Sequence, residues 1–410
     1  MKSTIIRFGE LYDIPSSNGL SRPSAVRGVG YKMINMGELF ANDIISDIDM
    51  ERVLMSDKEK EKFLVNQGDL LFARQSLVAS GAGKCSIVKD VKEPTTFESH
   101  LIRVRLNQDK ANPWFYYYLF KLQNNPIKGI VNQCAQAGIR GNELLKVKVP
   151  YIAKTEQDKI VDVLYDYDHL IENNNKRIKI LEQMAENLYK EWFVRFRFPG
   201  HEDVEFSAGE PKDWVLTKLE EIINIDRGLS YSSDEIDCDE GSDLINLKNI
   251  QAFGGFRIDG TKKYSGKYKE QQIVQRGDLV MGVTDMTQDR RTVGAVALIP
   301  VIHNISVISA DLIKLTSKLN NVFLYCMFKY GGVSMYISQF ANGANVLHLR
   351  PQVVNRVKVF LPTENIIDMF SKVVQPIIDE VDLLNEKNDN LIKQRDLLLP
   401  RLMSGKLEVK

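Results

Sequence analysis

The stretch Gly68-Asp-Leu-Leu-Phe-Ala-Arg74 has a counterpart in the second half of the 410-residue chain, Gly277-Asp-Leu-Val-Met-Gly-Val283. Each copy is a short apolar run that follows a Gly-Asp pair, which is the pattern of a strand entered from a turn. Further short matches flank this pair in the same order and at a nearly constant offset: Gly19-Leu-Ser21 with Gly228-Leu-Ser230, Ile34-Asn35 with Ile245-Asn246, Leu101-Ile102 with Leu312-Ile313, Phe120-Lys121 with Phe328-Lys329, and Val147-Lys-Val149 with Val357-Lys-Val359. Matches that keep one order and one offset indicate an internal duplication.

A different pattern follows each copy of the repeat. After Pro150 and after Pro362, apolar residues alternate in steps of four and three, which predicts one long helix per copy with a heptad seam. The seams are Ile160, Leu164, Tyr167, Ile171, Asn174, Ile178, Leu181, Ala185, Leu188 and Trp192, and Val374, Ile377, Val381, Leu384, Asn388, Leu391, Arg395, Leu398 and Leu402. Each seam contains one Asn, which either fixes the register of helix pairing or lies at a solvent-exposed end of the seam.

The expected fold class is therefore α+β: two similar domains, each with a small mixed sheet plus helices, joined by two long helices that pair as an antiparallel coiled coil with pseudo-two-fold symmetry. The predicted segments are a first domain at 1–154, a first helix at 155–195, a linker at 196–213, a second domain at 214–362 and a second helix at 363–410. Residues 160–192 would form roughly 50 Å of helix, the length of roughly 15 base pairs of DNA. Such a molecule could hold two readers at a fixed spacing.

Composition excludes some classes of protein. The chain is 44% hydrophobic and 26% charged, with 54 basic and 54 acidic residues, which is ordinary for a soluble globular protein. No apolar run is long enough to cross a bilayer, and the four cysteines form no CxxC pair, so we expect a cytoplasmic protein with no metal site. A net charge of zero still permits local basic patches that bind DNA.

No catalytic constellation is present in the sequence. The Asn/Asp-Pro-Pro-Tyr/Phe segment of adenine methyltransferases is missing, and Phe253-Gly-Gly-Phe256 only weakly echoes a methyl-donor loop. A Gly-x-x-x-x-Gly-Lys-Ser/Thr phosphate loop is also missing. The nuclease-like run Glu59-Lys-Glu-Lys62 reads as a solvated helix face. The sequence therefore predicts no catalytic residues and no cofactor in this chain.

Several segments resemble the specificity subunit of type I restriction-modification systems. They are Gly68-Asp-Leu-Leu-Phe-Ala-Arg74, Leu188-Tyr-Lys-Glu-Trp-Phe-Val194 followed by Phe198-Pro-Gly200, and Leu397-Leu-Leu-Pro-Arg-Leu-Met-Ser-Gly-Lys406, and the resemblance extends over almost the whole chain. It implies two target recognition domains that read a bipartite site in double-stranded DNA, and two spacer helices that dock two DNA adenine methyltransferase (modification) subunits. Two restriction/translocase subunits can be added, and the partners are expected to use S-adenosylmethionine, ATP and Mg. It implies no membrane partner.

Base reading calls for Arg or Lys opposite guanine and Asn or Gln opposite adenine. In the first domain, the candidate DNA-binding residues are Arg74, Gln75, Lys84, Gln136, Arg140 and Asn142. In the second domain they are Thr284, Gln288, Arg290, Arg291, Asn342, Asn345, His348 and Arg350. The reading loops differ, because Phe72-Ala-Arg-Gln75 corresponds to Met281-Gly-Val-Thr284, as expected for domains that read different sequences.

Candidate residues for helix pairing or partner docking are Asn174, Leu181, Leu188, Trp192, Phe193, Asn388, Leu391 and Leu398. Packing within the chain would explain the cluster of Leu188, Trp192 and Phe193 nearly as well as docking does. Two alternative functions remain at this stage. One is a coiled-coil scaffold or protein-binding module without DNA specificity, and the other is a self-contained enzyme acting on nucleic acid, which the missing motifs argue against.

Overall fold

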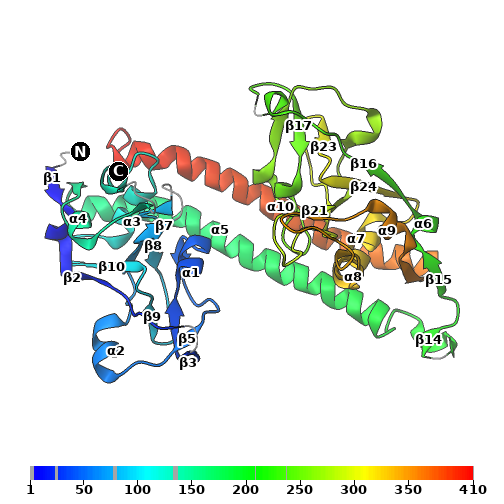
Figure 1. The fold of residues 1–410 in the computed structure, drawn as a ribbon, viewed down its shortest axis with the longest axis horizontal. Helices are drawn as coiled ribbons and strands as arrows, with labels where there is room; N and C mark the ends of the chain where they lie inside the picture. Colours follow the sequence, from blue (N-terminus) through cyan, green and yellow to red (C-terminus); the bar gives the residue numbers. More distant parts are fainter. Residues whose placement is uncertain are drawn as a thin grey trace. The chain divides into compact units, whose positions relative to one another are not determined.

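The computed structural model describes residues 4–23, 26–76, 81–132, 137–207, 209–236 and 238–409. The chain forms two compact units, shown in Figure 1. Unit 1 comprises Met1–Glu172 and Asp389–Lys410, and unit 2 comprises Asn173–Asn388. Both units combine small sheets with helices, which confirms the expected α+β class. Among the described residues, no helix is long and apolar enough to span a bilayer.

Unit 1 contains a mixed sheet and several shorter ladders. Its strands are β1 (Thr4–Arg7), β2 (Tyr12–Asn18), β3 (Arg27–Ile34), β4 (Ile44–Ile45), β5 (Arg52–Val53), β6 (Leu70–Ala73), β7 (Gln75–Ser76), β8 (Cys85–Val88), β9 (Thr95–Phe97), β10 (Leu101–Leu106), β11 (Ala137–Gly138) and β12 (Lys148–Tyr151). The strand orders are β2-β10-β6-β8-β4 and β5-β3-β9, with the separate pairs β1-β12 and β7-β11. Its short helices are α1 (Met36–Ala41), α2 (Asp57–Phe63), α3 (Pro113–Lys121) and α4 (Gly141–Leu144).

The core of unit 1 is built around α3, the aromatic run that we expected to be core. Asn112 caps the helix by accepting the Trp114 N–H at 3.0 Å, and Pro113 supplies the first turn. Phe120 packs edge to face on Phe8 and Phe72, with ring centroids 5.0 and 5.3 Å apart. The aromatic residues of this helix therefore stabilise the unit and are not exposed for base stacking.

Unit 2 repeats this plan with its own strands and helices. The strands are β13 (Phe206–Ser207), β14 (Glu210–Pro211), β15 (Val215–Lys218), β16 (Ile223–Arg227), β17 (Ser242–Ile245), β18 (Lys262–Tyr264), β19 (Ile273–Val274), β20 (Leu279–Gly282), β21 (Thr284–Asp285), β22 (Val296–Leu298), β23 (Ser306–Ile308), β24 (Leu312–Ser317), β25 (Leu347–His348) and β26 (Lys358–Leu361). The sheets are β16-β24-β20-β22, β18-β17-β23-β19, β15-β26, β21-β25 and β13-β14. The short helices are α6 (Leu219–Ile222), α7 (Asn321–Tyr330), α8 (Val333–Ser338) and α9 (Pro351–Arg356).

The repeated Gly-Asp pair forms the same turn in both units. Gly68 and Gly277 have φ angles of 86° and 83°, a left-handed conformation that glycine adopts without steric cost. The carboxylate of Asp69 accepts the Asn66 N–H at 2.8 Å, and that of Asp278 accepts the Gln275 N–H at 3.0 Å. The duplication read from the sequence is thus a duplication of local structure.

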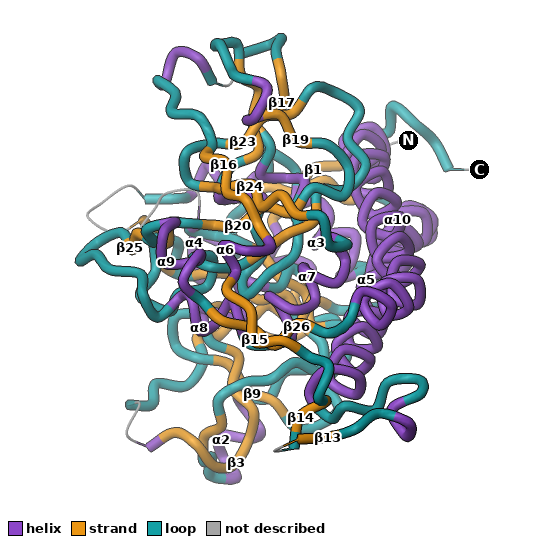
Figure 2. Tube along the Cα trace, turned by 90° about the vertical axis from the view of Figure 1, so that its right-hand side faces the viewer, coloured by secondary structure: helices purple, strands orange, loops and turns teal. Residues whose placement is uncertain are grey.

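The two long helices are α5 (Lys154–Tyr189), which continues as a π-helical turn at Lys190–Val194, and α10 (Glu364–Met403). Within unit 2 they are antiparallel, because Asn174 contacts Asn388 whereas Tyr189 contacts Phe370. Within unit 1, Asp168 of α5 is paired with Arg395 of α10. Figures 1 and 2 both draw α5 and α10 side by side, as these contacts require.

The segment predicted as a linker is partly integrated into unit 2. Phe198 is 2% exposed and stacks on Trp214 with ring centroids 5.8 Å apart. Phe193, from the end of the first long helix, also packs on Trp214, at 5.8 Å. The described residues of this segment therefore connect two elements, and its phenylalanine Phe198 is part of the unit 2 core.

Candidate nucleic-acid interface

Two loops that are distant in the sequence meet in unit 1. Strands β7 and β11 pair antiparallel, with Gln75 opposite Gly138 and Ser76 opposite Ala137. Just beyond this ladder, the Ile139 N–H donates to the Arg74 carbonyl at 2.9 Å. We call residues 74–76, 81–84 and 137–142 the unit 1 loop pair.

The equivalent loops meet in unit 2. Strands β21 and β25 pair antiparallel, with Thr284 opposite His348 and Asp285 opposite Leu347. The Gln288 side-chain amide also donates to the Ala344 carbonyl at 3.0 Å, which joins the two loops near their tips. We call residues 283–293 and 342–350 the unit 2 loop pair.

The two loop pairs are supported by matched backbone hydrogen bonds. In each unit, one bond closes the first loop at its base, one joins that loop to the neighbouring β-turn, and one joins it to the second loop. From donor to acceptor these are Gly83 to Ala73, Arg74 to His100 and Ile139 to Arg74 in unit 1, and Gly294 to Gly282, Val283 to Asp311 and Leu349 to Val283 in unit 2, all at 2.8–2.9 Å. The same scaffold therefore carries different side chains in the two units.

Most of the predicted residues of unit 1 lie on its loop pair. Arg140 and Asn142 are exposed, whereas Arg74 and Gln75 are half-buried. Gln75 Oε1 lies 3.2 Å from His100 Nδ1. Gln136 lies outside the described residues.

Lys84 differs from the other unit 1 candidates because its ammonium group is held by its own domain. Its Nζ donates to the Phe40 carbonyl at 2.7 Å, lies 3.2 Å from Asp43, and sits 5.5 Å from the centre of the Phe40 ring. Lys84 thus fastens the first loop to the end of α1, a contact that the sequence did not indicate.

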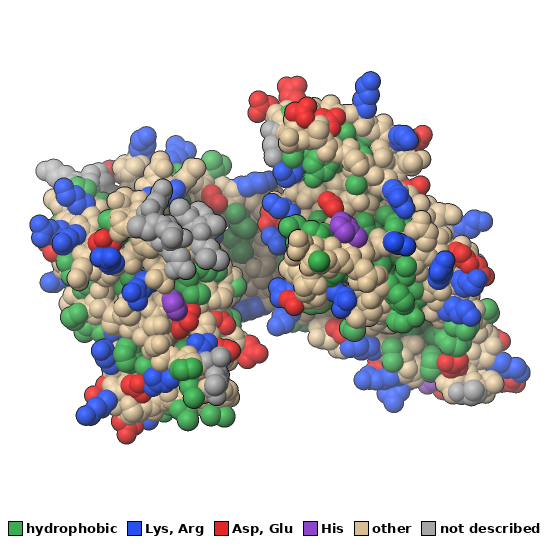
Figure 3. Space-filling model, viewed as in Figure 1, with side chains coloured by type: hydrophobic (Ala, Val, Ile, Leu, Met, Phe, Trp, Pro, Cys, Tyr) green, Lys and Arg blue, Asp and Glu red, His purple; other side chains and the backbone are tan. Residues whose placement is uncertain are grey.

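The predicted residues of unit 2 are mostly exposed on its loop pair. The exposed candidates are Gln288, Arg291, Asn342, Asn345, His348 and Arg350. Arg290 is half-buried with a left-handed φ of 54°, and its Nε has no hydrogen-bond partner among the described residues. Arg291 forms an ion pair with Asp289 at 2.6 Å. Figure 3 shows Lys and Arg side chains on the visible face of both units, so local positive charge coexists with zero net charge.

Thr284 is placed beneath the loop and not on its surface. It is 6% exposed, and its hydroxyl donates to Asp311 Oδ1 at 2.9 Å. Its polar atom is therefore used inside the domain, because strand β21 turns this side chain toward the core.

The residue that organises the unit 2 loop is Asp285, which sequence reasoning missed. It is 2% exposed, and its carboxylate accepts N–H groups from Thr287 at 2.7 Å and from Thr292 at 2.6 Å, as well as the Thr287 hydroxyl at 2.8 Å. Burial alone would raise the pKa of Asp285, but these donors outweigh it and the pKa lies below its usual value. The sequence did contain a signal for this role, because Asp285 is an acidic residue at the start of a loop rich in basic and amide side chains.

The predicted docking residues divide into two groups. Trp192 and Phe193 are 8% and 9% exposed and pack on Phe370 of α10, which agrees with helix pairing or packing within the chain, the alternatives to partner docking. The other docking candidates remain at the surface or at the helix seam: Leu181, Leu188, Leu391 and Leu398 are half-buried, and Asn174 and Asn388 bond to each other.

The long helices expose other apolar side chains, which the seam analysis did not single out. The exposed fractions of these helix residues are 50% for Leu170, 61% for Ile180, 47% for Met184 and 71% for Leu397. Ile180 and Met184 lie one helical turn apart on the same face of α5. Exposed apolar groups at this spacing are suited to covering by a partner helix.

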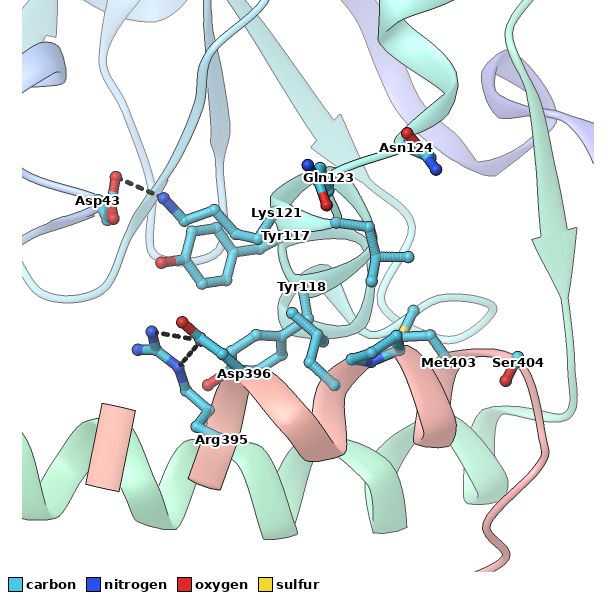
Figure 4. Close-up of a pocket in the computed structure, with 13 residues that line it drawn as sticks. Asp43, Tyr117, Tyr118, Lys121, Gln123, Asn124, Arg395, Asp396, Met403 and Ser404 are labelled. Carbon is cyan, nitrogen blue, oxygen red and sulfur yellow. Dashed lines mark hydrogen bonds and ion pairs between the residues drawn. The ribbon is translucent and has the colours of Figure 1, made fainter. Parts of the chain in front are cut away.

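A pocket of about 730 Å³ lies in unit 1 between α3 and the end of α10 (Figure 4). Its charged groups are already paired: Lys121 with Asp43 at 2.5 Å, and Arg395 with Asp396 at 2.8 Å. Among the described residues, no group of three or more His, Cys, Asp or Glu side chains is arranged to hold a metal. The charged groups in this pocket therefore form ion pairs with one another.

Comparison with known proteins agrees with this architecture. Residues 5–183 match the family model of the type I restriction modification DNA specificity domain. The MjaIX specificity subunit of a type I restriction enzyme from Methanocaldococcus jannaschii is 25% identical over 83% of this chain and 79% of its own length. A putative MjaX specificity subunit of the same organism is 24% identical over 96% of this chain and 91% of its own length. Among solved structures, the S subunit of a type I restriction-modification system from M. genitalium has the same fold, with a TM-score of 0.58, 15% identity, and coverage of 98% of this chain and 96% of that one.

The class of protein that these matches indicate is a DNA specificity subunit. Residues 5–183 match the DNA specificity domain of type I restriction-modification systems, and the chain as a whole is similar to the specificity subunits of such systems, in agreement with the resemblance seen in its sequence.

Proposed function

We propose that this chain reads a bipartite target in double-stranded DNA, one half with each unit, and recruits the subunits that methylate and cut. The observation that carries this proposal is the repeated loop scaffold with different side chains, since Arg74 and Gln75 in unit 1 are replaced by Val283 and Thr284 in unit 2. Two readers with one scaffold and different surfaces would recognise two unlike half-sites.

Base reading is proposed for the exposed members of the loop pairs. In unit 1 these are Arg140 and Asn142, with Arg74 and Gln75 behind them. In unit 2 they are Gln288, Arg291, Asn342, Asn345, His348 and Arg350, together with half-buried Arg290. Guanidinium and amide groups form paired hydrogen bonds with guanine and adenine edges in the major groove. Thr284 and Lys84 would act by holding the loops in shape.

The long helices are the proposed site for partners, which we expect to be two adenine methyltransferase subunits and, in a complete system, two restriction/translocase subunits. Exposed apolar residues such as Ile180 and Met184 support this assignment. The partners would supply S-adenosylmethionine, ATP and Mg chemistry, and the whole complex would work in the cytoplasm.

The test is to map methylated adenines in cells that express candidate methyltransferase subunits with and without this chain. We expect methylation of a gapped two-part motif that depends on the chain. Exchange of residues 1–150 for those of another specificity subunit should change one half of the motif and leave the other half intact. Unchanged methylation, together with no associated methyltransferase, would overturn the proposal.

Binding in vitro separates this function from a protein scaffold. Phosphate contacts release counterions, so affinity for DNA should fall steeply as salt rises. A coiled-coil scaffold without DNA specificity would show no salt-sensitive mobility shift. Double Ile180→Glu and Met184→Glu substitution should abolish co-purification with the methyltransferase while leaving that mobility shift in place.

A further inference from the structure

Phe253 is exposed in a conformation that phenylalanine rarely adopts. Its φ angle is 65°, in the left-handed region, and 65% of its surface is accessible. A left-handed conformation is unfavourable for a residue with a large side chain, and exposure of an aromatic ring forgoes the gain from burial. Such features persist where the surrounding structure imposes them, often at functional sites.

The turn that carries Phe253 is held firmly. The Gly254 N–H donates to the Gln251 carbonyl at 3.0 Å, and the Gly255 N–H donates to the Val296 carbonyl at 2.9 Å. Phe256, at the end of the turn, packs against the apolar core formed around β20, β22 and β23. One phenylalanine of the turn therefore anchors it, and the other points its ring toward solvent.

The same turn is attached to the unit 2 loop pair. The Phe253 N–H donates to the Arg291 carbonyl at 2.7 Å, so the backbone of Phe253 is bonded directly to the loop that carries Gln288, Arg290 and Arg291. The turn that carries the exposed ring is thus bonded through its backbone to the loop of the proposed base readers. It adds an apolar group to a surface whose other exposed groups are mostly polar.

We propose that Phe253 contacts the 5-methyl group of a thymine in the half-site that unit 2 reads, which makes it a specificity-determining residue. This inference rests on the proposed function. The thymine methyl is the apolar feature of base edges in the major groove, where amide and guanidinium readers also act, and phenylalanine is one of the side chains that contact it. A rigid ring beside flexible polar readers would favour an A·T pair at one position.

Unit 1 has no phenylalanine at the position that corresponds to Phe253, although Phe40 is 40% exposed beside Lys84 of its loop pair. Asn35 and Asn246 occupy matching places in the repeat, and the residue as far beyond Asn35 as Phe253 is beyond Asn246 is Asn42. Asn42 caps the end of α1, and its side chain donates to the Glu38 carbonyl at 2.9 Å. The contact proposed for Phe253 concerns the unit 2 half-site, so uracil substitutions in the other half-site should affect wild type and Phe253→Ala equally and provide an internal control.

The experiment uses the full chain assembled with its methyltransferase subunits and a duplex that carries the mapped methylation motif. Each thymine of both half-sites, on either strand, is replaced in turn by uracil, which removes only the methyl group. Dissociation constants are measured for wild type, Phe253→Ala and Phe253→Leu. Phe360→Ala is the matched control, because Phe360 is an exposed phenylalanine on β26, outside the loop pair.

We expect one uracil substitution in the unit 2 half-site to weaken wild-type binding about fourfold, the effect of losing one buried methyl group. Phe253→Ala should weaken binding to the unmodified duplex by a similar factor and lose the response to that uracil. Phe253→Leu should keep part of the response, and Phe360→Ala should keep all of it.

The inference is overturned if Phe253→Ala binds as tightly as wild type, if it retains the full uracil response, or if no uracil in that half-site weakens wild-type binding. The proposed function fails separately, when wild type does not prefer the mapped duplex over a scrambled one. Because the ring is largely exposed, circular dichroism of Phe253→Ala should match that of wild type, which excludes misfolding as the cause of weaker binding.

Discussion

Asn174 of α5 donates its side-chain amide to Asn388 Oδ1 of α10 at 2.9 Å, and Asn388 donates in turn to Asn175 Oδ1 at 2.9 Å. Asn388 is 6% exposed, so this pairing lies within the helix seam of unit 2. Of the two interpretations of the seam asparagines, the structure supports their role in fixing the register, because a shift of either helix would leave a buried amide unpaired.

The first prediction concerns this pair. Asn388→Ala should lower the free energy of unfolding by about 1–2 kcal/mol, since it removes a buried partner of Asn174. The double variant Asn174→Leu with Asn388→Leu should be at least as stable as wild type, because no polar group is then left unpaired. Thermal unfolding measures both, with Glu386→Ala on the exposed side of α10 as the control. A double variant less stable than Asn388→Ala would contradict this reasoning.

The second prediction concerns a buried charge pair in unit 1. Arg395 is bonded to Asp168, which is 7% exposed, and Asp168 also accepts the Tyr118 hydroxyl at 2.6 Å. Asp168→Leu alone should destabilise the protein by about 1–3 kcal/mol, because the Tyr118 hydroxyl loses its buried acceptor and half-buried Arg395 keeps only Asp396. Adding Arg395→Leu should restore part of the loss. Urea unfolding of the single and double variants measures these changes. If the losses in the free energy of unfolding from the two substitutions simply add, Asp168 and Arg395 are not coupled.

The third prediction concerns Asp285, which holds the unit 2 loop. Asp285→Asn should cost about 1–3 kcal/mol, since the amide cannot replace all of the hydrogen bonds that the carboxylate accepts from Thr287 and Thr292. Binding to the unit 2 half-site should weaken, and binding to the unit 1 half-site should remain.

The pH dependence of this contribution has a definite sign. Because the folded pKa of Asp285 is lowered, its stabilisation is complete above the unfolded pKa of about 4 and is lost as pH falls through the lower folded value. The difference in the free energy of unfolding between wild type and Asp285→Asn, measured by urea unfolding at a series of pH values, should therefore become smaller only in acid. A stability difference that stays constant down to pH 2 would contradict this prediction.

The fourth prediction has the opposite sign. Burial raises the pKa of Asp382 in unit 2 to about 6. The folded protein therefore holds this proton more tightly than the unfolded chain, so wild-type stability should fall as pH rises from about 4 to 6. Asp382→Asn removes this titration and should be about 1–2 kcal/mol more stable than wild type at pH 7, but equal to it near pH 4. Equal stability at both pH values would show that the carboxyl titrates normally.

The fifth prediction separates the two readers with matched substitutions. Asn142 and Asn345 are both exposed, one on each loop pair. Asn142→Ala should relax base preference in one half of the methylation motif and Asn345→Ala in the other, each at a cost of about 1–3 kcal/mol for the cognate pair. Methylation mapping of the two variants checks this. A change in the same half for both variants would show that the units do not read separate half-sites.

Much of the fold could be predicted from local patterns. The turns at Gly68 and Gly277 require a residue in the left-handed conformation followed by a hydrogen-bond acceptor. The adjacent Gly and Asp of the sequence meet both requirements. The seams of α5 and α10 could also be predicted from the sequence, because helical periodicity depends on residues three and four apart. The site was predicted as two loops per unit, and the structure brings those loops together.

The individual roles within the loops could not be predicted in the same way. Thr284 is buried, Lys84 is held by Phe40 and Asp43, and Asp285 organises a loop without standing out in the sequence. Each of these facts depends on a partner distant in the chain.

The sequence by itself determined the duplication, the strands and turns of each copy, the two seam helices and the absence of catalytic motifs. Only the tertiary structure decided that β7 meets β11 and β21 meets β25, that Trp192 and Phe193 are buried, and that Phe253 is exposed beside Arg291. The physical reason is that turns and helical faces are set by interactions between near neighbours in the chain. Strand pairing and burial depend instead on which distant segments come together to remove apolar surface from water and to satisfy backbone hydrogen bonds.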